Sequence, residues 1–175
     1  MKLTTRDIDP YLKQKPCHPV VLVYGPDHGL VKERTQTLAR FIVPDLSDPF
    51  NVAVMTGDQV AQTPARFTDE TTALSMMGGD RVILVNDAVD AMTPTLKSYL
   101  AAPVPGTFVI VSADDLSTKS TLRKLAETDP NAAALPCYVQ DSAEIGRIIQ
   151  STLRTANLSI ERDALAFLSE SSRGD

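Results

Sequence analysis

Three residues near the start of the chain are of types that can bind phosphate. Gly25 and Gly29 follow an apolar run at 20–24, and Lys32 comes three positions after the second glycine. Glycines after a buried strand let backbone N–H groups wrap a phosphate, and a lysine at the start of the next helix neutralises its charge. Nucleotide binding is therefore the first chemistry to consider.

The spacing of these residues does not fit a working phosphate loop. The active pattern is G-x-x-x-x-G-K-[ST], in which the lysine reaches the outer phosphates and the hydroxyl holds Mg²⁺. If Gly25 is the first glycine of the pattern, Leu30 stands at the second glycine and Val31 at the lysine. If Gly29 is instead the second glycine, Leu30 stands at the lysine and Val31 at the hydroxyl. Lys32 comes one residue too late. We predict a degenerate loop that does not bind nucleotide.

The ends of two later apolar runs also lack the residues of an ATP-hydrolysing site. In such a site, a Mg²⁺-binding aspartate at the end of a strand is followed by a catalytic glutamate. Here Asp87 is followed by Ala88, and Ser112 is followed closely by two aspartates. Together with Asp27 in the loop, these acidic groups would repel phosphate. The sequence therefore has the outline of an ATPase without its catalytic groups.

The elements that would position these residues alternate along the first 140 residues. Three of the apolar runs are rich in Val and Ile and continuously apolar, which is typical of parallel strands buried on both faces. Alternating strands and helices predict an α/β domain with a parallel sheet. Strands are expected at 19–25, 50–57, 81–88, 107–113 and 136–140, and helices near 5–14, 29–43, 64–77, 89–101 and 117–128.

After residue 140 the pattern becomes purely helical. Apolar residues recur at helical spacing over 145–153, and a further helix is expected over about 160–168. Two such helices alone cannot bury both of their apolar faces well. We therefore predict two domains, an α/β domain at 1–140 and the first helices of a truncated helical domain at 141–175.

The composition limits the classes of partner. The chain carries 17 Lys and Arg against 22 Asp and Glu, a net charge of −5, so electrostatic attraction of the whole chain to DNA is not expected. No apolar run approaches the ~18–20 residues of a membrane-spanning helix, and no signal peptide is visible, which predicts a cytoplasmic protein without membrane contact. Cys17 and Cys137 lack metal-ligand spacing, so we expect no metal site and at least half-buried structural thiols.

Three stretches resemble the delta subunit of the bacterial DNA polymerase III clamp loader. They are VYGPDHGLVKERTQTL at 23–38, ALSMMGGDRVILVNDA at 73–88 and FVIVSADDLSTKSTLRKLAE at 108–127. The resemblance implies an AAA+-like P-loop domain with a five-stranded parallel sheet flanked by helices, followed by a small all-helical lid domain. It also implies that the loop has lost nucleotide binding and that no cofactor is needed. The chain would then be no enzyme by itself but a subunit of the DNA-directed DNA polymerase III holoenzyme, a nucleotidyltransferase complex.

The same resemblance implies partners in DNA replication. Members of the family bind the ring-shaped sliding clamp, the beta subunit, and help to open it for loading onto primed DNA. The gamma/tau and delta prime subunits complete the loader, and DNA is contacted through the complex. The clamp-binding residues implied by the match are Leu74, Ser75, Met76 and Met77. Met77 stands where an aromatic residue is often found, but a flexible thioether also fits irregular pockets.

Helical periodicity gives a separate argument about the two methionines. On a helix over 64–77, Phe67 lies on the buried face, Met76 lies on the opposite side and Met77 lies at the edge, before a glycine pair ends the helix. Single exposed hydrophobic residues are also common without any partner. Without the resemblance, the alternatives are a small P-loop NTPase or nucleotide kinase with an atypical loop, or a flavodoxin-like ligand-binding domain.

Overall fold

A computed structural model describes the chain except for residues 74, 76–77, 139–148, 151–152, 154–157 and 172–175. The chain divides into two compact units, Met1–Cys137 and Tyr138–Asp175. Helix α8, Arg162–Ser171, belongs to the second unit. No helix in the described part of the chain is both long enough and apolar enough to cross a membrane.

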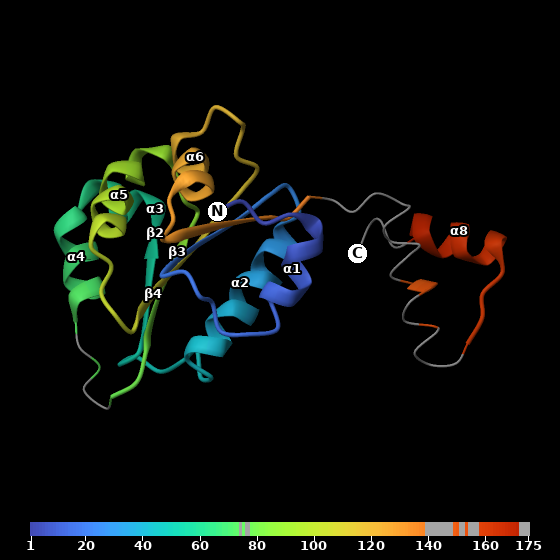
Figure 1. Ribbon diagram of the computed structural model, residues 1–175, viewed down its shortest axis with the longest axis horizontal. Helices are drawn as coiled ribbons and strands as arrows, with labels where there is room; N and C mark the ends of the chain where they lie inside the picture. Colours follow the sequence, from blue (N-terminus) through green and yellow to red (C-terminus); the bar gives the residue numbers. More distant parts are fainter. Residues whose placement is uncertain (74, 76–77, 139–148, 151–152, 154–157, 172–175) are drawn as a thin grey trace. The chain divides into compact units, whose positions relative to one another are not determined.

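The first unit is built on one sheet of five parallel strands in the order β2-β3-β4-β1-β5 (Figure 1). Every residue of the interior strand β1 is buried, as expected for a strand that is covered on both faces. The predicted α/β class with a five-stranded parallel sheet is confirmed. The strands are β1 Val20–Tyr24, β2 Val52–Thr56, β3 Arg81–Asn86, β4 Thr107–Ala113 and β5 Ala132–Pro136.

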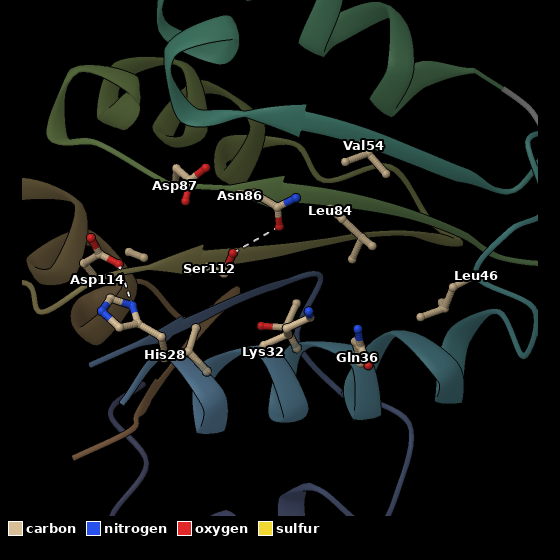
Figure 2. A pocket seen from close by; sticks show the side chains of 13 residues that line it. His28, Lys32, Gln36, Leu46, Val54, Leu84, Asn86, Asp87, Ser112 and Asp114 are labelled. Atoms are coloured by element: carbon tan, nitrogen blue, oxygen red, sulfur yellow. Dashed lines mark hydrogen bonds and ion pairs between the residues drawn. The ribbon is translucent and has the colours of Figure 1, made fainter. Parts of the chain in front are cut away.

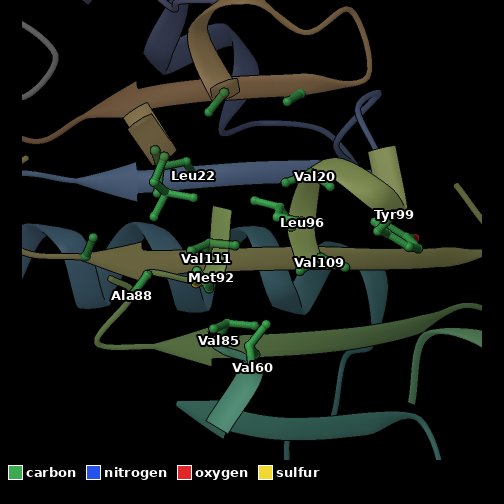
Figure 3. Close-up of a cluster of buried hydrophobic side chains, with 14 of the residues drawn as sticks. Val20, Leu22, Val60, Val85, Ala88, Met92, Leu96, Tyr99, Val109 and Val111 are labelled. Atoms are coloured by element: carbon green, nitrogen blue, oxygen red, sulfur yellow. The ribbon is translucent and has the colours of Figure 1, made fainter. Parts of the chain in front are cut away.

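Helices cover the two faces of the sheet and bury a separate apolar cluster on each. Helices α1 (Thr5–Tyr11) and α2 (His28–Ile42) cover one face. The other face carries α3 (Gly57–Gln62), α4 (Pro64–Thr72), the short 3₁₀ turn η1 (Asp90–Met92), α5 (Thr93–Ala101) and α6 (Thr121–Thr128). Figure 3 shows this second cluster, in which side chains of β3 and β4 meet those of the covering helices. The sheet is therefore held rigidly between two cores, and its strand ends are fixed in space.

The last strand lies earlier in the chain than predicted. We expected it at 136–140, but β5 ends at Pro136 and all five of its residues are buried. Alanine has low strand propensity, so its run at 132–134 does not look like a strand in the sequence. The chain start covers the outer edge of β5, because the Leu3 N–H donates to the Ala134 carbonyl at 2.9 Å and the Ala134 N–H donates to the Met1 carbonyl at 2.8 Å.

Helix α4 ends at Thr72, well before the predicted end at residue 77. Ala73 already has extended dihedral angles, with φ −63° and ψ 131°. The Thr72 hydroxyl donates to the Thr68 carbonyl at 2.8 Å, a side-chain bond of the kind that weakens helix interiors. The predicted end of this helix at residue 77 was therefore wrong, and the positions that periodicity assigned to Met76 and Met77 lie outside the described residues.

Candidate functional site

The loop between β1 and α2 presents a carboxylate where a phosphate-binding loop presents open backbone donors. Asp27 is the N-cap of α2, and its Oδ1 accepts a hydrogen bond from the Leu30 N–H at 2.9 Å. The first N–H groups of a helix are the groups that would otherwise hold an anion. Asp27 satisfies one of them and adds a negative charge, so the arrangement disfavours a phosphate at this helix end.

Gly25 is required by the chain itself rather than by a ligand. Its φ is 155°, and a Cβ at this position would lie 2.0 Å from the carbonyl oxygen of Cys137. The Cys137 N–H donates to the Tyr24 carbonyl at 2.7 Å, which holds the chain that leaves β5 against the loop. Arg34 of α2 fastens the same segment through a 3.0 Å hydrogen bond from Nη1 to the Pro136 carbonyl. Protein backbone thus packs directly against the first glycine of the loop.

The other two predicted loop residues have different surroundings. Gly29 is exposed in the first turn of α2, and a Cβ there would meet only the Asp27 Oδ1 within 4 Å, at 3.4 Å. Glycine is therefore not needed at position 29. Lys32 is exposed one turn further along α2 and makes no ion pair with any residue that the structure describes. It lines a cavity on the α2 side of the sheet.

This cavity has a volume of about 510 Å³ and lies between α2 and strands β2 to β4 (Figure 2). It brings together the polar groups that end the strands: the Ser112 hydroxyl donates to the Asn86 Oδ1 at 3.2 Å. His28 and Asp114 form a contact of 3.1 Å between Nδ1 and Oδ1 at the exposed end. Asp87 follows β3 with a positive φ of 51°, as expected of a loop residue. Across the described residues, no group of three or more His, Cys, Asp or Glu could hold a metal ion.

The thiols have unlike environments. Cys137 is buried, and burial raises the pKa of its thiol, so it stays neutral in the chain that leaves β5. Cys17 is exposed, which corrects the expectation that both thiols are at least half buried.

Of the four residues that the resemblance assigns to clamp binding, the structure describes Ser75. Leu74, Met76 and Met77 lie outside the described residues. The Ser75 hydroxyl donates to the Gly78 carbonyl at 2.8 Å, and the Gly78 N–H donates to the Ser75 carbonyl at 3.3 Å. These two bonds bring together the residues that flank the methionine pair in the sequence.

The glycine pair after the methionines lies at the surface. Gly78 and Gly79 have φ values of 77° and 94°, which residues with a Cβ rarely adopt. Both are exposed, and no described atom lies within 4 Å of a Cβ placed on either. Gly78 and Gly79 therefore lie at the surface of the α/β unit.

Two ion pairs involve Asp80 and Arg81, the residues that follow the glycine pair. The Arg81 Nη2 at the start of β3 lies 3.2 Å from the Glu70 Oε2 on α4, and the Arg81 side chain is only 10% exposed. Beside it, the Lys15 Nζ lies 2.5 Å from the Asp80 Oδ2. Sequence analysis did not find these contacts, because neither pair has the spacing of neighbours on one helix or strand. The Arg81–Glu70 pair ties α4 to the start of β3, and the Lys15–Asp80 pair ties the residue before β3 to the chain after α1.

Comparison with known proteins gives consistent matches. The family model for the DNA polymerase III delta subunit matches residues 22–137. A probable DNA polymerase III subunit delta from Rickettsia prowazekii (strain Madrid E) is 23% identical over 161 residues, which cover 89% of this chain and 46% of the relative. The chain thus spans about half the length of the curated relative it matches.

A solved clamp loader structure has the same fold as this chain. The Bacillus subtilis DNA clamp loader delta protein matches with a TM-score of 0.70 and 20% identity, covering 94% of this chain and 51% of that chain. This match confirms the fold class that the sequence resemblance implies. Domain III of the Thermotoga maritima replication initiation protein DnaA has a TM-score of 0.49 and 14% identity, covering 97% and 75% of the two chains. Because the family model covers well over half of the chain, the chain belongs to the family of DNA polymerase III delta subunits.

Proposed function

We propose that this chain binds the DNA polymerase sliding clamp and helps to open the ring for loading onto primed DNA. In this proposal, it acts within a clamp loader whose gamma/tau and delta prime subunits supply the remaining parts. Membership of the delta family supports the class of function. The observation that supports the assignment to a site is the pair of hydrogen bonds between Ser75 and Gly78, which flank two methionines in the sequence.

The proposed contact consists of the segment 74–77. Leu74, Met76 and Met77 provide apolar side chains, and methionine adapts to irregular pockets because its chain is unbranched and polarisable. Such a short segment binds well only if little freedom is lost on binding. The buried Arg81–Glu70 pair supports this requirement, because it holds the base of the segment in place before any partner arrives.

Ring opening follows from binding only under one condition. A ligand shifts an equilibrium by no more than the difference between its affinities for the two states. We therefore propose that the segment binds the open clamp more tightly than the closed clamp. The energy for opening then comes from this contact and requires no chemistry in the chain.

We further propose that this chain does not hydrolyse ATP, in contrast to the alternative of a small P-loop NTPase or nucleotide kinase. The Asp27 cap on α2 and the packing of Cys137 on Gly25 support this proposal. Leu30 and Val31 also stand where the active pattern needs its lysine and hydroxyl when Gly29 is its second glycine. Titration with ATP and Mg²⁺ tests it: saturable binding in the micromolar range would favour the NTPase.

The clamp contact is tested by surface plasmon resonance on immobilised sliding clamp from the same organism. The Met76→Ala, Met77→Ala double variant is compared with the unaltered chain and with Phe50→Ala, a control that truncates a 57% exposed phenylalanine elsewhere. Loss of a central contact of this kind costs about 1–3 kcal/mol, or about 5- to 150-fold in Kd. Equal binding by all three proteins, with thermal unfolding unchanged, would place the contact outside 74–77.

A further inference from the structure

The cavity between α2 and strands β2 to β4 has no role in the proposed clamp contact. We propose that it binds an apolar group that carries a carboxylate, which is the chemistry of a polypeptide C-terminal residue or of an N-acylated amino acid. Its volume of about 510 Å³ suits a ligand of this size. The proposal rests on three properties of its walls: apolar surface, unused donors and the position of its charges (Figure 2).

The apolar wall is formed by side chains that the fold leaves partly uncovered. Val54 lies on the edge strand β2 and is 56% exposed, although its strand neighbours Ala53 and Met55 pack into the unit. Leu84 of β3 and Leu46 after α2 are half buried and line the same cavity. Covering this surface with an aliphatic group removes it from water, which favours a ligand with a branched apolar side chain.

The donors of the cavity are not used by the protein. The Asn86 Oδ1 accepts the hydrogen bond from Ser112, so the Asn86 amide nitrogen keeps its two N–H groups. Neither this nitrogen nor the Gln36 amide nor the Lys32 ammonium makes a side-chain hydrogen bond or ion pair with the residues that the structure describes. Lys32 and Gln36 are four residues apart and share one side of α2. These hydrogen-bond donors of the cavity favour a ligand that carries oxygen acceptors.

The charges determine where a carboxylate can lie. Figure 2 shows His28, Asp87 and Asp114 at one end of the cavity, and Gln36, Leu46 and Val54 at the other, with Lys32 between the two ends. The Asp114 carboxylate contacts the His28 ring, whereas the Lys32 ammonium has no carboxylate partner among the described residues. A ligand carboxylate therefore pairs with Lys32 and its apolar group extends toward Val54, away from the aspartates.

The test is an NMR titration of isotopically labelled protein with N-acetyl-leucine and with N-acetyl-leucinamide, which differ only in the carboxylate. We expect saturable shifts at the methyl groups of Val31, Val54 and Leu84, and about tenfold tighter binding of the acid because of the charged hydrogen bond. Lys32→Met should abolish this preference. Lys97→Met, which removes an exposed lysine of α5, should leave it unchanged.

Two further results decide the proposal and the source of the ligand. A six-residue peptide with a C-terminal leucine that binds more tightly than N-acetyl-leucine identifies a polypeptide end as the ligand, and equal binding identifies a small acid. The proposal is overturned if the acid gives no saturable shifts up to about 10 mM, a Kd too weak for function. Equal binding of acid and amide, or an unchanged preference in Lys32→Met, also overturns it. None of these outcomes depends on clamp binding.

Discussion

Replacing Gly25 by alanine tests whether the loop after β1 now serves to hold the chain together. The new Cβ would lie 2.0 Å from the Cys137 carbonyl oxygen and 2.5 Å from its carbonyl carbon. Real Cβ contacts essentially never fall below 3.0 Å, and both neighbours are backbone atoms that cannot rotate away. The chain leaving β5 must therefore move by about 1 Å.

The cost has three sources. Overpacking costs about 1–3 kcal/mol. An alanine at φ 155° adds about 1–3 kcal/mol of backbone strain. Moving Cys137 also weakens its 2.7 Å hydrogen bond to Tyr24, which is worth about 1 kcal/mol. We expect a total loss of about 3–7 kcal/mol, a large part of the ~5–15 kcal/mol that stabilises a typical domain.

The matched control is Gly29→Ala, in the same loop and helix start. Its Cβ meets only Asp27 Oδ1, at 3.4 Å, so the change should stabilise α2 by about 0.5–1 kcal/mol. Urea unfolding followed by far-ultraviolet circular dichroism measures both variants, since the chain has no tryptophan to report by fluorescence. Similar losses in the two variants, or a loss below about 1 kcal/mol for Gly25→Ala, would refute this account of the loop.

Three further predictions concern single side chains. Thr35→Val should raise the free energy of unfolding by about 1 kcal/mol in urea, because its buried Oγ1 has no partner among the described residues. Glu70→Gln should lower it by about 1–2 kcal/mol, because the nearly buried Arg81 loses its carboxylate. Hydrogen bonds from the Ser120 hydroxyl and a backbone N–H lower the pKa of Asp90, so its contribution is present at neutral pH and is lost as pH falls below about 4. Thermal unfolding between pH 3 and 7 should therefore depend less on pH in Asp90→Asn.

The sequence allowed most of the sheet to be predicted, because its strands are dense in Val and Ile. The run VVLVY of β1 and the run FVIV within β4 are continuously apolar, and both strands lie in the interior of the sheet. Strand β5 could not be found in this way. Its alanines are buried because β5 lies between β1 and the chain start. Local strand propensity does not indicate this long-range arrangement.

Helix ends show a second limit of sequence patterns. Helix α3 was missed, although Thr56 and Gln59 form a capping box that is visible in the sequence as T-x-x-Q. Helix α4 was extended too far, because no glycine or proline appears before Gly78 to mark an earlier end. The threonines of α4 are weak helix formers. Our prediction gave more weight to the apolar pattern than to this low helix propensity.

In the candidate site, too, local sequence features could be predicted and tertiary contacts could not. The misfit of Leu30 and Val31 to a phosphate-binding pattern is a local property, so it could be predicted from the sequence. The contact between Gly25 and Cys137 is long-range, and the Arg81–Glu70 pair joins two consecutive elements, so no spacing rule indicates either contact. The clamp-binding role of 74–77 stays a prediction that rests on the family and on the hydrogen bonds that flank the methionine pair.

The most direct test of the central claim is the Kd of the chain for its sliding clamp, measured with and without ATP and Mg²⁺. We predict saturable binding with the same Kd in both conditions, because the proposal assigns the contact to the segment 74–77 and expects no nucleotide in the loop after β1. Binding that appears only with ATP, or no binding in either condition, would contradict the account.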